Sequence, residues 1–258
     1  MPLDLLALYA KLPVFLMVTA RLAGMVMFQP ILGSLAFPAT LRALLVLGLA
    51  ALATPLVPFA GPLPDTLLGL TLALGGEVLL GGLIGLVATL VFVGVQMGGT
   101  LVDQETGLAF GQIVDPTTGQ NLSLLSNFYV QLCAVVYLTV GGHRTLLCAC
   151  LDTFRTVPLL GGSDLPARGT DLLVAGLTTG CDVAVRVAAP ALLTLFLVNV
   201  ALGFISRTLP QLNVTTVGFA VKGLIAFVVL ALALPTALAA FTDGLAATFD
   251  SLQELLGH

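Results

Sequence analysis

Charged residues inside long apolar stretches are the first candidates for chemistry in this sequence. Arg21, Arg42, Glu77, Asp182 and Arg186 lie in such stretches. A charge at mid-bilayer costs at least ~2.5–3.5 kcal/mol on insertion scales, so it usually marks a function or a protein contact. Asp182 and Arg186 are four residues apart on one predicted helix face, which favours a pair that neutralises itself. Arg21 and Glu77 have no local partner, so we expect them to face other helices or subunits.

Histidine and cysteine do not indicate a metal or catalytic centre. The four cysteines have no CxxC pair and no histidine at ligand spacing, which favours small buried apolar side chains. They are Cys133, Cys148, Cys150 and Cys181. His143 follows two glycines at a predicted helix end, where capping is favoured over proton relay or metal binding. HExxH, GxSxG and the phosphate-binding loop are all absent, so we predict no enzyme and no cofactor.

The elements that hold these residues are predicted to be membrane helices. The chain is 58% hydrophobic and 9% charged, with a mean hydropathy of +1.12, whereas soluble domains are roughly 45–50% apolar and about 25% charged. Its charge-free stretches are near the ~20 residues that span a bilayer as a helix. They cover 43–64, 78–102, 116–143, 187–206 and 223–242. The sequence therefore predicts an all-α, polytopic membrane-associated protein, and without a Lys/Arg cluster nucleic acid is not an expected partner.

Proline, glycine and capping residues place the helix ends. We expect helices at about 5–27, 39–53, 67–102, 122–140 and 144–157, then a hairpin of 172–205 and 218–238. Asp65 and Thr66 offer an N-cap for the third helix. Pro190 is a possible break in the first hairpin helix. The turn lies around 209–216, and an acidic tail, 243–258, closes the chain.

Small residues recur along the third helix at a spacing that promotes helix packing. Gly81 and Gly85, and again Gly94 and Gly98, are four residues apart, and such pairs let backbones approach closely in lipid. Together with Arg21 and Glu77, we expect these glycines to form contacts between subunits.

At this point an ordered series of motifs resembles the FliR/SctT family of type III export-gate proteins over nearly the whole chain. In the first half these are RLAG at 21–24, Pro30, Pro38, QMGG at 96–99, GLAF at 107–110 and Asp115-Pro116. The second half adds Gly142-His143, DTF at 152–154, Pro158, Ala189-Pro190, NVALG at 199–203, Arg207, PQLN at 210–213 and Gly218-Phe219.

The resemblance implies a fold, partners and a location. Residues 1–171 would be FliP-like helical hairpins, and residues 172–258 a FliQ-like helical hairpin with the acidic tail. Several FliP and FliQ subunits would form a closed cone with this chain in the inner membrane, at the flagellar basal body. Unfolded flagellar subunits would pass through its centre. The hairpin tip would dock FlhB through Pro210, Gln211, Leu212, Asn213 and Lys222.

Between two apolar helices, the polar and glycine-rich stretch 104–121 cannot be a regular lipid-facing element. Non-helical backbone at membrane depth must be buried in protein or line a cavity, so we predict a pore plug. Disorder is the alternative. Glycines would let the plug fold tightly, apolar side chains would form a gasket and proline would fix its return. The residues are Gln104, Gly107, Leu108, Phe110, Gly111, Ile113, Asp115, Pro116 and Gly119.

Other functions remain open from the sequence. An injectisome export-gate homologue would handle unfolded chains in the same way. A small-solute transporter would need ionisable groups converging at mid-membrane, usually within an internal repeat, and no convincing repeat is present. An intramembrane enzyme lacks its catalytic residues.

Overall fold

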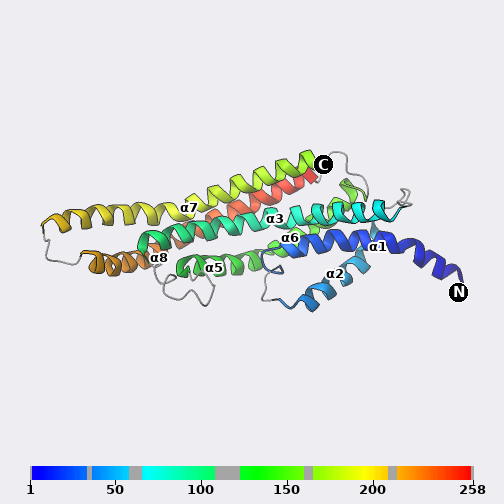
Figure 1. The fold of residues 1–258 in the computed structure, drawn as a ribbon, viewed down its shortest axis with the longest axis horizontal. Helices are drawn as coiled ribbons and strands as arrows, with labels where there is room; N and C mark the ends of the chain where they lie inside the picture. Colours follow the sequence, from blue (N-terminus) through cyan, green and yellow to red (C-terminus); the bar gives the residue numbers. More distant parts are fainter. Residues whose placement is uncertain are drawn as a thin grey trace. The chain divides into compact units, whose positions relative to one another are not determined.

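The structure is a computed structural model that describes residues 2–33, 37–57, 66–107, 123–159, 165–208 and 214–256. Within these ranges it contains helices and their connections, with no strand (Figure 1). The α-helices are α1 (Pro2–Phe28), α2 (Ala39–Ala53), α3 (Leu67–Thr106), α5 (Leu124–Val140), α6 (Gly142–Thr156), α7 (Leu165–Thr208) and α8 (Val214–Leu256). A short 3-10 helix, η1 (Thr54–Leu56), follows α2. The all-α prediction is confirmed.

Several predicted helix ends were wrong, and α3, α7 and α8 are longer than expected. α3 continues to Thr106, and α7 already begins at Leu165, inside the predicted linker. α7 also runs through Pro190 without a break, because proline removes only one backbone donor and neighbouring groups can compensate in membrane helices. α8 reaches Leu256, so the predicted acidic tail is the last part of a helix.

Two helix starts have clear local causes. Thr66 caps α3 as predicted, since its Oγ1 accepts a hydrogen bond from the Gly69 amide at 3.1 Å. Gly141 separates α5 from α6 in the left-handed region, with φ +80°. Glycine adopts that conformation without the steric penalty of a Cβ atom. The predicted glycine break between these helices is confirmed.

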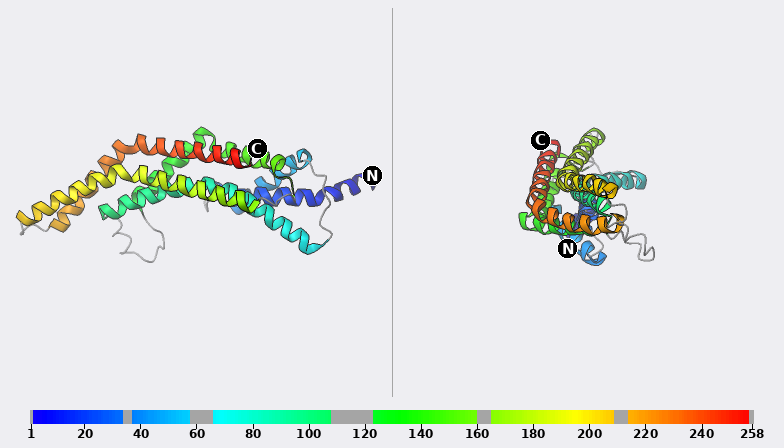
Figure 2. Two further views of the ribbon diagram at one scale, coloured as in Figure 1. Left: turned by 90° about the horizontal axis from the view of Figure 1, so that it is seen from above. Right: turned by 90° about the vertical axis from the view of Figure 1, so that its left-hand side faces the viewer.

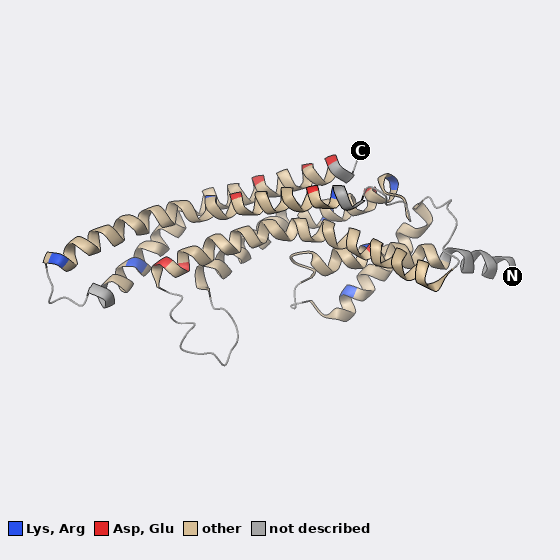
Figure 3. Cartoon of the chain, turned by 45° about the horizontal axis from the view of Figure 1, so that its top comes forward, with Lys and Arg blue, Asp and Glu red and all other residues tan. Residues whose placement is uncertain are grey.

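Four of the described helical segments are long and apolar enough to cross a membrane. They are Ala39–Leu56, Leu67–Thr106, Arg168–Thr208 and Gly218–Glu254, and the pair α5 and α6 passes the same test when taken together. Very few described residues in these helices carry charge (Figure 3). The prediction of a polytopic membrane protein is therefore confirmed.

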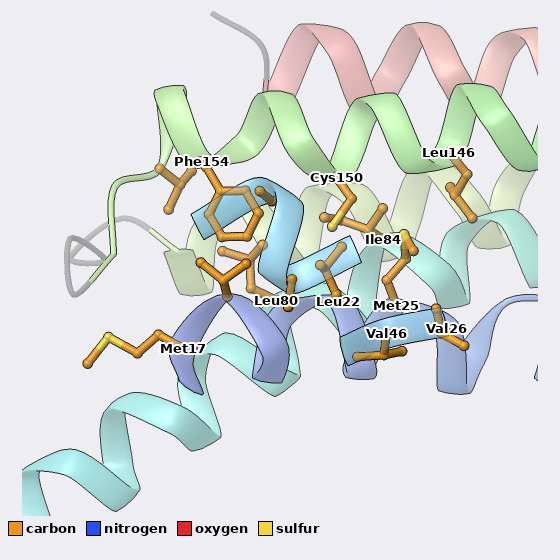
Figure 4. Packing of buried hydrophobic residues seen from close by; sticks show 14 of the residues in the cluster. Met17, Leu22, Met25, Val26, Val46, Leu80, Ile84, Leu146, Cys150 and Phe154 are labelled. Carbon is orange, nitrogen blue, oxygen red and sulfur yellow. The ribbon is translucent and has the colours of Figure 1, made fainter. Parts of the chain in front are cut away.

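The chain forms two compact units, and α3, α7 and α8 contribute residues to both. The first contains Met1–Leu90, Gly141–Leu177 and Ala246–His258. Its core includes Met17, Leu22 and Met25 from α1, Val46 from α2, Leu80 and Ile84 from α3, and Leu146, Cys150 and Phe154 from α6 (Figure 4). α7 and α8 add Leu172 and Leu252 to the same cluster. Apolar faces of helices distant in sequence thus meet in one cluster.

The second unit contains Val91–Val140 and Thr178–Leu245. Phe92 of α3 packs edge-to-face against Tyr137 of α5, with ring centroids 5.5 Å apart, and against Phe241 of α8 at 4.9 Å. α7 and α8 run side by side in this unit (Figure 2). The division into a FliP-like 1–171 and a FliQ-like 172–258 follows a likeness to other proteins and stays a prediction.

Candidate functional site

A buried ion pair joins α1 to α3 in the first unit. Arg21 Nε donates to Glu77 Oε2 at 2.6 Å, and the two side chains are 0% and 7% exposed. The other two guanidinium nitrogens bind to α6 and to the residue that follows it. Nη1 donates to Thr153 Oγ1 at 3.0 Å. Nη1 and Nη2 both donate to the Val157 carbonyl, at 3.2 and 3.1 Å. The guanidinium also lies 4.3 Å from the ring centroid of Phe154.

Each nitrogen of the Arg21 guanidinium therefore has an acceptor within the chain. Glu77 lies on another helix, so the expectation that the pair faces other helices holds for this structure. Both side chains are buried within this one chain, and their assignment to contacts between subunits stays a prediction. A buried ion pair needs good geometry and further hydrogen bonds to offset its desolvation, and this pair has both.

The predicted glycine pairs also pack inside the chain. A Cβ atom added at Gly81 would lie closer than 3.0 Å to the Arg21 carbonyl oxygen, and one at Gly85 as close to that of Met25. In the second unit, Gly94 faces the Gly180 carbonyl in the same way, and a Cβ at Gly98 would lie 2.8 Å from the Ala184 carbonyl oxygen. Each of these four glycines thus allows close backbone approach to α1 or α7 within the chain. Their contacts with other subunits stay a prediction.

Two exposed charges in the middle of α7 neutralise one another. Arg186 Nε and Asp182 Oδ2 are 2.8 Å apart, and the side chains are 54% and 56% exposed. The predicted self-neutralised pair is confirmed. It leaves neither residue as a lone charge for proton transfer.

Most of the predicted plug lies outside the described residues. Leu108, Phe110, Gly111, Ile113, Asp115, Pro116 and Gly119 are among these. Gln104 belongs to α3 and is exposed, so the irregular stretch begins later than predicted. Gly107 ends α3 with φ +79°, and a Cβ atom there would overlap the Phe219 ring of α8. Both the conformation and the space require glycine at this position.

Sequence reasoning missed Asp103, which lies at the base of this segment. Its carboxylate is 1% exposed and accepts hydrogen bonds from the Ser123 hydroxyl and from the Leu125 and Ser126 amides, the last two at 3.3 Å. Those amides belong to the first turn of α5, where backbone N–H groups lack helical partners. The only sequence signal was an acid at the end of an apolar helix.

The predicted docking tip is partly described. Pro210, Gln211, Leu212 and Asn213 lie outside the described residues. Lys222 lines an open pocket of about 290 Å³ between α7 and α8. Its other lining residues are Asn199, Leu202, Gly203, Ser206, Gly218 and Phe219.

Among the described residues, no group of three or more His, Cys, Asp or Glu side chains could hold a metal ion. Cys133 and Cys150 are buried as expected, but Cys148 and Cys181 are exposed. The expectation of buried cysteines was therefore wrong for two of the four. His143 is half-buried, and its Nδ1 has no hydrogen-bond partner among the described groups.

The fold and these buried groups define a polytopic helical membrane protein whose polar core residues fasten helices together. Residues 12–248 match the family described as bacterial export proteins, family 1. Because this match covers most of the chain, the chain belongs to that family. It is a component of a type III export apparatus, and family membership confirms the prediction that it is not an enzyme.

Individual relatives agree with this assignment. The chain is 27% identical to the flagellar biosynthetic protein FliR of Caulobacter vibrioides over 228 residues, which cover 88% of this chain and 90% of the relative. It is 30% identical to FliR of Pectobacterium carotovorum over 181 residues, covering 70% and 69%. It is also 30% identical to Yop proteins translocation protein T of Yersinia pestis over 164 residues, or 62% of each chain.

Proposed function

We propose that this chain is a subunit of the flagellar protein-export gate, which assembles with FliP and FliQ into the pore for unfolded flagellar subunits. Family membership and several FliR relatives support this proposal. We place the complex in the inner membrane, at the flagellar basal body. No cofactor is needed, because the gate holds a path open or closed and performs no bond chemistry.

Exposed apolar helix faces are consistent with a chain that is covered by lipid and other subunits. In the second unit, Phe196 and Phe204 of α7 and Leu224 and Leu232 of α8 are all more than 60% exposed. Leu44 and Leu52 of α2 are equally open in the first unit. Soluble monomers rarely leave extended apolar patches uncovered. Neighbouring subunits such as FliP and FliQ would cover part of this surface.

The segment between α3 and α5 is proposed as the plug of the closed pore. The observation that supports this proposal is where the segment lies: α3 ends at Thr106 and α5 begins at Leu124, so a 17-residue stretch, 107–123, rich in glycine and polar residues, connects two apolar helices. Loops longer than about 12–15 residues are usually functional or disordered, and backbone in the membrane must be covered by protein or face water. A steric, apolar seal satisfies both conditions.

Shortening the segment tests the plug. Removing residues between Gly107 and Gly119 should raise ion leakage across the membrane. The amount of assembled complex in the membrane should not change. A matched control removes residues 161–163, between α6 and α7, and should leave conductance unchanged. Unchanged conductance of the plug variant, in a complex shown to be assembled, would refute the seal.

An injectisome export gate is the second candidate, because the match to the Yersinia translocation protein is as high in identity as that to the Pectobacterium relative. Complementation separates the two. We expect this chain to restore motility to a flagellated strain that lacks FliR, and not secretion to an injectisome strain that lacks its homologue. The reverse result would favour the injectisome.

A further inference from the structure

A groove of about 490 Å³ lies between α2, η1 and α6 within the first unit, and this volume is typical of ligand sites. Most of its lining is apolar, and includes Leu22, Leu52, Leu56, Leu147, Leu151 and Phe154. Leu52 and Leu56 are 72% and 82% exposed. Open apolar surface in a groove favours an apolar occupant.

Two charged side chains of α6, Asp152 and Arg155, also line this groove. They are three positions apart, so they lie on one helix face, and both are exposed. Neither forms an ion pair or a side-chain hydrogen bond with another described residue. Asp182 and Arg186 of α7, by contrast, do pair with each other. The groove therefore presents one negative and one positive charge beside each other, and each lacks a partner among the described side chains.

These charges lie at the end of a possible membrane span. The bent pair α5 and α6 is apolar enough to form one span that ends at Thr156, so Asp152 and Arg155 belong to its last two turns. Lipid headgroups surround the ends of a spanning helix. Leu147 precedes Arg155 by about two turns, or ~12 Å of helix rise. The apolar part of the groove thus extends from the charged end along the span.

We propose that this groove binds an acyl chain of a phospholipid with a zwitterionic headgroup, of the phosphatidylethanolamine type. The apolar walls hold the chain between α2 and α6. Arg155 donates to the phosphate, and Asp152 accepts from the ammonium group. This site is separate from the export path, and it does not depend on the proposed plug.

Charge complementarity selects this occupant. Phosphatidylethanolamine carries a phosphate and a primary ammonium group on a short linker, so one molecule offers a partner to both charges. Phosphatidylglycerol has the phosphate but no cation for Asp152. An apolar helix of a neighbouring subunit would cover the leucines and leave both charges unpaired, which is costly at the edge of a membrane.

Photocross-linking tests the site in the membrane complex that contains the full-length chain, purified and reconstituted into phosphatidylglycerol vesicles. Two trace lipid probes carry the same photoreactive diazirine on an acyl chain, one with the phosphatidylethanolamine headgroup and one with phosphatidylglycerol. Mass spectrometry then locates the attached lipid. The first probe should attach to residues 49–57 and 147–155 about two- to fivefold more than the second, the range expected for one exposed ion pair.

Single variants assign the two charges. Asp152→Asn removes the acceptor of the ammonium group and should lower attachment of the phosphatidylethanolamine probe to that of the phosphatidylglycerol probe. Arg155→Gln removes the phosphate donor and should lower attachment of both probes. Asp182→Asn, in the exposed pair of α7, is the matched control and should change neither. Because Asp152 and Arg155 are exposed, their replacement should not prevent folding.

The native cysteines give a second measurement on the same complex in detergent. Cys148 lines the groove, and Cys181 is exposed on α7 outside it. Added phosphatidylethanolamine should slow the alkylation of Cys148 by a maleimide and leave that of Cys181 unchanged. An unchanged rate at Cys148 would contradict lipid binding in the groove.

Two cross-linking results overturn the inference. Equal attachment of the two probes at the groove, or a preference that persists in Asp152→Asn, would show that the charges do not recognise the headgroup. Attachment of both probes elsewhere on the chain but not in the groove would show that something else, such as a helix of a neighbouring subunit, occupies it.

Discussion

Arg21 of α1 and Glu77 of α3 form an ion pair at 2.6 Å whose charges are almost completely enclosed by the same chain. The contact spans 56 positions of sequence. Together with the hydrogen bond from the Thr89 hydroxyl to the Phe28 carbonyl, it fixes the registry of two otherwise apolar helices. The helices are held together at this point by charge as well as by packing.

Removing one member of this pair should destabilise the chain strongly. Glu77→Gln leaves the Arg21 guanidinium buried without its counter-charge, and breaking a buried pair in this way costs about 3–5 kcal/mol. Thermal unfolding in detergent measures the effect. Arg186→Gln in the exposed pair with Asp182 is the control and should cost ~1 kcal/mol or less.

A double variant makes that prediction sharper. Arg21→Met together with Glu77→Leu should lose less stability than the sum of the single changes, since neither charge then stays unpaired. Strict additivity would show that the two side chains do not depend on one another.

Glycines of α3 should divide into two classes when each is changed to alanine. Gly94→Ala places a methyl group against the Gly180 carbonyl and should cost about 1–3 kcal/mol, as overpacking usually does. Gly75→Ala meets no atom within 4 Å, so it should gain ~0.5–1 kcal/mol from lower backbone entropy in the unfolded chain. The two variants are compared by their unfolding midpoints, measured in the same detergent. If both variants changed the stability by the same amount, or if Gly94→Ala left it unchanged, the close contact of Gly94 with α7 would be contradicted.

Cross-linking tests the predicted docking of FlhB at the hairpin tip. A cysteine at Asn213 should form a disulfide with cysteines along the FlhB loop in assembled gates, because the tip residues Gln211 and Asn213 can recognise backbone groups. The native exposed cysteines, Cys148 and Cys181, are replaced first. A cysteine at Leu72, which is 70% exposed on α3, is the control and should form no such link. Absence of a link at every position, with the gate assembled, argues against docking.

Hydropathy and glycine spacing were sufficient to predict the helical membrane fold. The partners of Arg21 and Glu77 could not be predicted, because one sequence carries no information on which distant residues meet. Asp103 was missed for the same reason: its acceptor role depends on α5, which begins after a long intervening segment. The predicted linker before α7 and the tail of α8 contain loop-forming residues, but long helices tolerate these where packing continues.

The glycine contacts of α3 also constrain the order in which the chain can complete its fold. Gly81 and Gly85 pack on α1, which has already been synthesised when α3 emerges. Gly94 and Gly98 pack on α7, whose contact residues Gly180 and Ala184 come much later. At ~5–20 residues per second, the wait is of the order of ten seconds. During biogenesis, the second half of α3 must therefore remain in the membrane with its bare glycine face unoccupied, a period in which an insertion chaperone or a neighbouring subunit has access to it.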